Sequence, residues 1–121
     1  MHLPSVLFAL HKVDDLMEGE EDEMAADLAK YERYAELLKT LGHPVRLCIV
    51  NGLMSSECNV TGIQECLGLP QSTISQHLGI LKSRGIIKGE RCGLEIIYSV
   101  VDEDVKKIVR TLMEAEPFQK K

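Results

Sequence analysis

A change of hydrophobic period near residue 85 constrains the fold of this chain more than any other feature of its sequence. Before that point, apolar side chains recur at spacings of three and four in residues 60–67 and in residues 71–84. Such spacing predicts a short helix and a longer one. The sequence Gly-Leu-Pro at 68–70 predicts a tight turn between the two helices.

After that point the apolar side chains follow the period of a β-strand. Residues 86–88 and 94–100 are rich in β-prone side chains, and residues 90–93 supply the turn of a hairpin. A short helix, a tight turn, a longer helix and a two-stranded ribbon define a winged helix-turn-helix. The predicted fold class is therefore mainly α with a two-stranded β-wing, in which the second helix enters the DNA major groove.

Further helices are predicted on both sides of this unit. Leucines and other apolar residues form a helical stripe over residues 3–17, and a second helix ends at Gly42. The helix that starts at Pro44 is apolar around much of its circumference, and Asn59 and Asp102 are expected as N-caps of later helices. The expected inner face of the helix that ends at Gly42 consists of Leu28, Tyr31, Ala35, Leu38 and Leu41.

These patterns divide the chain into three predicted parts. Residues 1–20 form an N-terminal helical extension with an acidic linker, residues 21–116 form the winged domain for DNA binding and dimerisation, and residues 117–121 form a tail. The length of 121 residues leaves room for one core.

The net charge of −5 argues against a nucleic-acid partner only until the charge is located along the chain. Residues 1–38 hold three basic and ten acidic side chains, whereas residues 39–121 hold eleven basic and nine acidic ones. The acid is therefore an N-terminal feature, and the predicted winged domain is mildly basic.

A recognition helix needs short polar side chains on its outer face, and residues 71–77 supply them. Gln pairs with adenine through two hydrogen bonds, Ser and Thr reach base edges or phosphates, and basic side chains meet flanking phosphates. A polar helix that is merely solvated is the simpler alternative, which the preceding helix-turn and the following basic hairpin disfavour. The predicted DNA contacts are Gln71, Ser72, Thr73, Ser75, Gln76, His77, Lys82, Arg84, Lys88 and Arg91.

Two of these side chains have an alternative role from the start. Thr73 can bond to the backbone near the start of the helix, and His77 is equally compatible with a partly packed side chain.

The stretches LLKTLGHPVRLCIVNGL, GLPQSTISQHLGILKSRGIIKGER and IIYSV resemble the ArsR/SmtB family of bacterial winged-helix repressors over about residues 31–112. The resemblance implies a homodimer whose first and last helices form the interface, bound to double-stranded DNA at a palindromic operator. It also implies repression that a small inducer relieves. One departure is Pro70, where many relatives have a capping Ser; because the fixed φ of proline suits a first turn, the helix is expected to survive.

The metal-binding patterns of that family are incomplete in this chain. The cysteines of its Cys-Val-Cys motif fall on Asn59 and Thr61. In its acid-and-histidine site, Asp104 stands where a histidine is usual, and the expected partners fall on Ala115 and Phe118. The sequence therefore identifies no metal site, and an ion bound by cysteine thiolates is kept as an alternative.

The four cysteines, Cys48, Cys58, Cys66 and Cys92, are candidates for sensing a thiol-reactive inducer, either an oxidant or reactive sulfur. A cytoplasmic chain is expected to keep them as thiols. Cys48 and Cys66 are expected to be small buried side chains. Cys58, at a helix entrance, is expected to have a lowered pKa, and Cys92 is expected to be exposed beside Arg91.

Other classes of function find less support. The sequence has no Gly-rich phosphate loop, nucleophile elbow or HExxH motif, so an enzyme is not expected. No apolar run approaches the roughly 20 residues of a membrane helix. The chain is expected in the cytoplasm without a membrane partner, and a winged helix that binds proteins instead of DNA is the remaining alternative.

Overall fold

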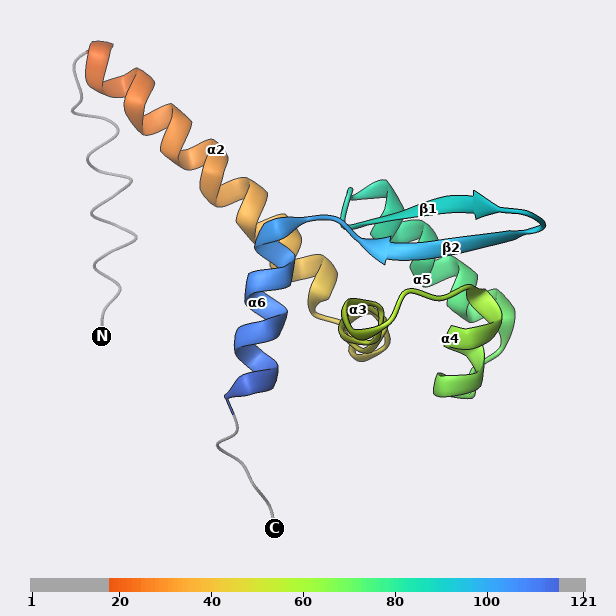
Figure 1. Cartoon of the computed structure of the whole chain (residues 1–121). Coiled ribbons are helices and arrows are strands. Elements are labelled where there is room, and N and C mark those ends of the chain that lie inside the picture. Colours follow the sequence, from red (N-terminus) through yellow and green to blue (C-terminus); the bar gives the residue numbers. More distant parts are fainter. Residues whose placement is uncertain (1–17, 116–121) are drawn as a thin grey trace. The chain divides into compact units, whose positions relative to one another are not determined.

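The computed structural model describes residues 18–115, and its elements occur in the predicted order (Figure 1). The elements are α2 (Glu18–Leu41), α3 (Pro44–Ser55), α4 (Val60–Leu67), α5 (Gln71–Ser83), β1 (Ile87–Cys92), β2 (Glu95–Val100) and α6 (Glu103–Glu114). The helix expected at residues 3–17 lies outside the described residues. The chain divides after Glu36 into two compact units, and the packing described below belongs to the second.

The helices of the second unit begin at the residues that the sequence marks as caps. Asn59 Oδ1 accepts a hydrogen bond from the Gly62 N–H at 2.8 Å, and Asp102 Oδ1 accepts one from the Val105 N–H at 3.0 Å. Each bond satisfies a backbone donor that has no partner inside its helix. Pro70 precedes α5 with φ −60° and ψ 147°, so the helix survives the proline as predicted.

The core of this unit is aliphatic and is formed where α3, α5, α6 and the base of the hairpin meet. Ile74, Leu78 and Leu81 of α5 are buried, as predicted from their spacing. Because apolar surface removed from water is the main favourable term in folding, these three residues hold α5 in place. The other buried apolar residues are Leu37, Leu41, Ile49, Val50, Leu53, Ile63, Ile86, Ile87, Val100, Val105 and Val109.

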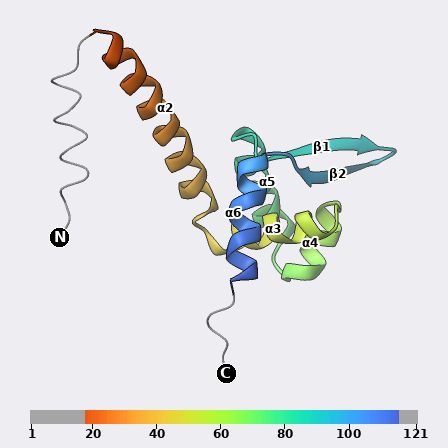
Figure 2. The same ribbon diagram turned by 60° about the vertical axis from the view of Figure 1, so that its left-hand side comes forward.

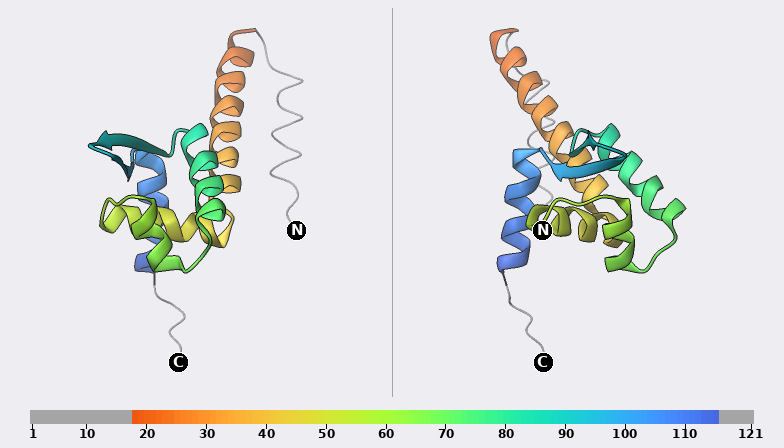
Figure 3. Two further views of the ribbon diagram at one scale, coloured as in Figure 1. Left: turned by 90° about the vertical axis from the view of Figure 1, so that its right-hand side faces the viewer. Right: turned by 45° about the vertical axis from the view of Figure 1, so that its right-hand side comes forward.

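The hairpin is longer and tighter than the sequence suggested. The two strands pair antiparallel with a register that ends at Cys92 opposite Glu95, so only Gly93 and Leu94 form the turn. The prediction of a turn over residues 90–93 was wrong. Gly93 takes φ +70°, a value that glycine adopts without a steric penalty, and this allows the two-residue turn. The tip of the hairpin lies apart from the helices (Figure 2; Figure 3, left).

The inner face of α2 also differs from the prediction. Leu37 and Leu41 are buried, whereas Leu38, which was expected to face inward, is 56% exposed. Leu37 and Leu41 are four residues apart and share a stripe, while Leu38 lies about 100° further around the helix.

Among the helices of the described chain, none combines the length and apolar character needed to cross a membrane.

Candidate nucleic-acid interface

Helix α5 presents a row of polar side chains away from the core. Ser72, Ser75 and Gln76 are exposed at positions i, i+3 and i+4, and Gln71 is exposed one residue earlier. This spacing places the row on one stripe of the helix. Thr73 is half-buried at the border of the row. Four of the predicted contacts are therefore brought together on one solvent-facing surface.

Gly79 extends this row by one more turn, and the sequence prediction missed it. The residue is exposed, and a Cβ built on it would meet no atom within 4 Å. A surface that approaches the row can therefore come close to the helix backbone at this point. Its spacing of i+7 from Ser72 was the signal available in the sequence.

Helix α4 and the turn support α5 from behind. Ile63 of α4 is buried, and α4 ends at Gly68, which has φ 69° and donates its N–H to the Gln64 carbonyl at 2.7 Å. The left-handed conformation at Gly68 ends the helix sharply and leads the chain into α5. This is the arrangement expected of a bracing helix and a recognition helix.

His77 lies on a different side of α5 and is held by α3. Its ring centroid is 4.5 Å from that of His43, and its Nδ1 accepts a hydrogen bond from Arg46 Nη1 at 3.3 Å. Arginine only donates, so this bond requires an unprotonated Nδ1. The Arg46 Nε donates in turn to the Thr40 carbonyl at 2.7 Å. The ring of His77 therefore ties the recognition helix to the start of α3.

The surroundings of His77 also change its titration. Burial lowers the pKa of His77, and the nearby His43 and Arg46 lower it further. The neutral imidazole is the form that accepts the Arg46 bond. The prediction missed His43 and Arg46, although the sequence HPVR that contains them lies within one of the stretches that carry the family resemblance.

The four predicted cations lie in α5, the turn after it and β1. Lys82, Arg84, Lys88 and Arg91 are all exposed. Lys88 Nζ is 3.4 Å from the Glu90 carboxylate, and both side chains are more than half exposed. An ion pair in such a setting contributes little to stability, so the lysine exchanges this partner readily for another anion.

The hairpin carries two features that the sequence prediction missed. A Cβ on Gly89 would lie 2.8 Å from Ile96 Cγ2 and 3.0 Å from Tyr98 Cε1, so only glycine fits this close cross-strand approach. Leu94 at the tip is 99% exposed. The wing therefore ends in an apolar side chain beyond the cations of β1.

The cysteines differ in three respects from their predicted settings. Cys48 and Cys66 were expected to be buried, but both are exposed. The prediction was wrong because the apolar pattern of their helices did not reveal which stripe faces the core. Burial raises the pKa of Cys58, and Cys66 raises it further, so the predicted lowering was wrong. Cys92 is exposed as predicted.

Cys58 lies just before α4 and is half-buried beside β2. Its carbonyl accepts the Tyr98 N–H at 2.9 Å, which fixes the residue against β2. A Cβ built on Gly62 would lie 3.5 Å from Cys58 Sγ, so this thiol packs over the first turn of α4. Cys66 lies one turn further along that helix, at i+4 from Gly62. Nowhere in residues 18–115 do three His, Cys, Asp or Glu side chains gather into a metal site.

A bracing helix, a tight turn, a second helix with an outward polar row and a basic hairpin define a winged helix-turn-helix regulator that binds DNA. Residues 43–88 match the family model described as bacterial regulatory protein, arsR family. The chain belongs to the ArsR family, whose members are transcriptional regulators and not enzymes.

The chain is similar to proteins that are described as repressors. The chain is 52% identical over 80 residues to the transcriptional repressor PagR of Bacillus anthracis, covering 64% of this chain and 79% of PagR. It is 43% identical over 74 residues to the repressor SmtB of Mycobacterium tuberculosis, covering 61% of this chain but only 55% of SmtB.

Solved structures show the same fold. The crystal structure of PagR matches with a TM-score of 0.65 at 46% identity, covering 70% of this chain and 98% of PagR. A homodimeric winged helix-turn-helix DNA-binding domain from Mycobacterium bovis matches with a TM-score of 0.65 at 29% identity, covering 72% of this chain and 81% of that one.

Proposed function

We propose that this chain is a repressor that binds a specific DNA site through the outer row of α5. The observation that carries the proposal is the exposed stripe of Ser72, Ser75 and Gln76 on a helix whose opposite face is buried. Short polar side chains on a rigid helix match the donor and acceptor pattern of the major groove. Gln71 and Thr73 lie at the start of the same helix and complete the proposed contacts.

The exposed cations supply the part of binding that does not depend on sequence. Lys82, Arg84, Lys88 and Arg91 meet backbone phosphates on either side of the site in this proposal. The Glu90 partner of Lys88 is displaced when phosphate replaces it. His77 positions α5 through Arg46 rather than reading bases, since its ring is engaged with α3.

We also propose that the active form is a homodimer on a palindromic operator. Leu38 is 56% exposed, and Leu112 and Met113 of α6 are 53% and 47% exposed. Apolar side chains left open at the two flanking helices are suited to burial against a second copy. A relative whose DNA-binding domain is described as homodimeric supports this assembly. Such a repressor would act in the cytoplasm. Its chain would consist of the N-terminal extension 1–20, the winged domain 21–116 and the tail 117–121.

A thiol-reactive inducer is proposed to release the DNA. Cys92 lies beside Arg91 in the wing and is exposed, so its oxidation adds bulk or charge next to a proposed phosphate contact. Cys58 lies just before α4, Cys66 is exposed in α4, and Cys48 is exposed on α3. A metal ion held by cysteine thiolates is the alternative, in which case partner-subunit or other ligands must complete the coordination.

DNA binding tests the first proposal directly. Fluorescence anisotropy is measured with duplexes from the region around the chain's own gene, at several salt concentrations. Gln76→Ala is expected to weaken binding to the preferred duplex about 5- to 150-fold, the range for losing one good base contact. Gln64→Ala, which removes a glutamine of α4, is the matched control. If no duplex binds in a salt-dependent way, the wing serves a protein partner and the proposal is overturned.

The inducer is tested on the same duplex. Protein that is reduced, oxidised, treated with polysulfide or loaded with Zn²⁺ is compared, with Cys92→Ser as the variant. Release by oxidant or polysulfide supports thiol sensing, whereas release by the metal alone contradicts it.

A further inference from the structure

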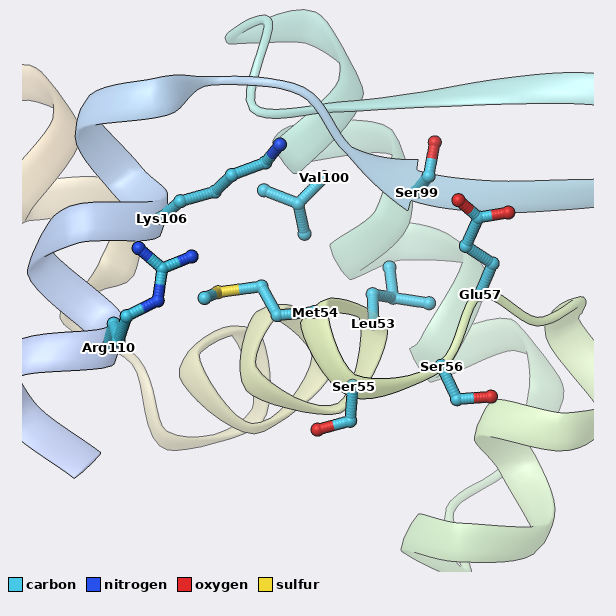
Figure 4. Close-up of a pocket in the computed structure, with 9 residues that line it drawn as sticks. All are labelled: Leu53, Met54, Ser55, Ser56, Glu57, Ser99, Val100, Lys106 and Arg110. Carbon is cyan, nitrogen blue, oxygen red and sulfur yellow. The ribbon is translucent and has the colours of Figure 1, made fainter. Parts of the chain in front are cut away.

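A cavity of about 600 Å³ opens between α3, β2 and α6, and none of the residues that line it belongs to α5. Every residue that lines it belongs to the unit that begins at Leu37. Its walls are the end of α3 with the loop that follows, the end of β2 and one face of α6 (Figure 4). No predicted site residue contributes to it.

One wall of the cavity is positive. Lys106 and Arg110 are four residues apart on α6, so they share a face of the helix, and both side chains point into the cavity (Figure 4). Lys106 Nζ is 3.1 Å from the carboxylate of Glu103, which is itself 77% exposed. Within the described chain Arg110 has no ion-pair partner. The guanidinium is therefore available to a bound carboxylate.

The opposite wall is negative and rich in acceptors. Glu57 lies across the cavity from Lys106 and Arg110 (Figure 4). The same wall includes the C-terminal turn of α3, where the Ser56 N–H donates to the Gly52 carbonyl at 3.0 Å. The carbonyls after Gly52 lie at the negative end of the helix dipole. This wall disfavours a second anion and suits a positively charged donor.

The middle of the cavity is apolar, with hydroxyls at its edge. Leu53, Met54 and Val100 lie between the two charged walls (Figure 4). Ser55 and Ser99 add hydroxyl groups that can donate or accept. Charges of opposite sign thus lie on two sides of Met54, whose side chain is half-buried, whereas Leu53 and Val100 are buried. The cavity has the size of a small-molecule site.

We propose that this cavity binds a small zwitterion, a molecule that carries a carboxylate and a protonated amine on an apolar stem. Its carboxylate lies between Lys106 and Arg110, and its amine lies against Glu57 and the end of α3. The stem covers Met54, the half-buried apolar side chain of the lining. A simple anion pairs with only one wall and gains no attraction from Glu57, which is exposed on the other wall and has the same sign of charge.

The cavity lies where α6, which carries proposed dimer contacts, meets the base of the wing. The ligand would touch α6, the base of the wing and the end of α3 together. Leu112, one of the two α6 side chains that we assign to the dimer contact, lies two residues beyond Arg110 and faces about 160° away on the helix, whereas Met113 lies about 60° from Arg110. A regulatory effect of the ligand rests on the proposed DNA-binding function, but binding of the ligand does not.

Binding is tested on the full chain without DNA. Amide chemical shifts are followed by NMR during titration with glycine, 4-aminobutanoate and 6-aminohexanoate, which differ in stem length. Hexanoate and hexylamine each carry one of the two charges and serve as matched probes. At least one amino acid is expected to give saturable shifts confined to the cavity walls, with affinity about tenfold above that of either single-charge probe.

Variants assign the binding to this site. Arg110→Ala is expected to weaken the best amino acid about tenfold, while Lys107→Ala removes the same charge from the same helix outside the cavity and is expected to change nothing. Arg110 is exposed, so its replacement does not remove a core contact. The proposal is overturned if none of the three amino acids binds below about 10 mM, if hexanoate binds as tightly as 6-aminohexanoate, or if Arg110→Ala binds like the parent chain. Failure of DNA binding alone would leave these outcomes intact.

Discussion

The thirteen residues of α5 form two faces, one buried in the core and one exposed to solvent. The inner face holds Ile74, Leu78 and Leu81 in the core, and the outer face holds Ser72, Ser75 and Gln76 in solvent. The inner face determines where the helix lies, and the outer row is left free for an external surface. Base readout requires a rigid helix whose polar groups have no partners within the protein. A helix that became ordered only on binding DNA would lose affinity through the entropy cost.

His77 stands between these two roles. It is polar, like the outer row, yet its ring contacts His43 and its Nδ1 accepts a bond from Arg46. A polar side chain on α5 can therefore serve the support rather than the reading surface. Substitutions on the two faces of α5 and at His77 are expected to separate the two roles.

Ile74→Ala is expected to lower the free energy of unfolding by about 2–5 kcal/mol, because the side chain is fully buried and its removal leaves a cavity in the core. Chemical denaturation measures the change. Ser75→Ala alters the adjacent exposed residue and is expected to stay within about 0.5 kcal/mol of the parent. Equal losses in both variants would show that the two faces of α5 do not differ as described.

Arg91→Ala is expected to weaken all duplexes to a similar degree and to reduce the slope of log affinity against log salt by about 1. The reason is that one phosphate contact is lost while the base-reading row is untouched. Anisotropy titrations over a range of salt give the slope, and denaturation should show unchanged stability because the side chain is exposed. A loss confined to one sequence would instead assign Arg91 to base readout.

His77→Gln is expected to reduce the dependence of stability on acid. The folded chain holds the pKa of His77 below its ordinary value of 6.5, so the unfolded chain binds the proton more readily. The contribution of the neutral ring is complete above about pH 6.5 and is lost as the pH falls through the lowered folded value. Denaturation from pH 7.5 to 5 measures this loss, and a parent chain with the same pH profile as His77→Gln would contradict the assignment.

The sequence was sufficient for those features that depend on near neighbours along the chain. The caps at Asn59 and Asp102, the turn before α5 and the buried stripe of α5 each follow from residues within a few positions of one another. Local backbone sterics and hydrogen bonds determine such features, so a single sequence reveals them. The family resemblance rested on the same segments.

Features that depend on distant contacts were predicted poorly. Cys48 lies in a helix that is apolar on several sides, so its exposure depended on which side met the core. Leu38 and Leu37 are adjacent in sequence, and only packing selected Leu37 for burial. The turn of the hairpin was misplaced because strand pairing through Cys92 opposite Glu95 outweighed the local turn signals.

By itself the sequence determined the order of elements, the winged helix-turn-helix and the polar content of its second helix, because periodicity and capping are encoded locally. The tertiary structure alone decided that His77 bonds to Arg46, that burial raises the pKa of Cys58, and that Lys106 and Arg110 face Glu57 across a cavity. These are relations between segments that lie far apart in the chain. They arise when the aliphatic core forms and fixes which faces of the helices meet.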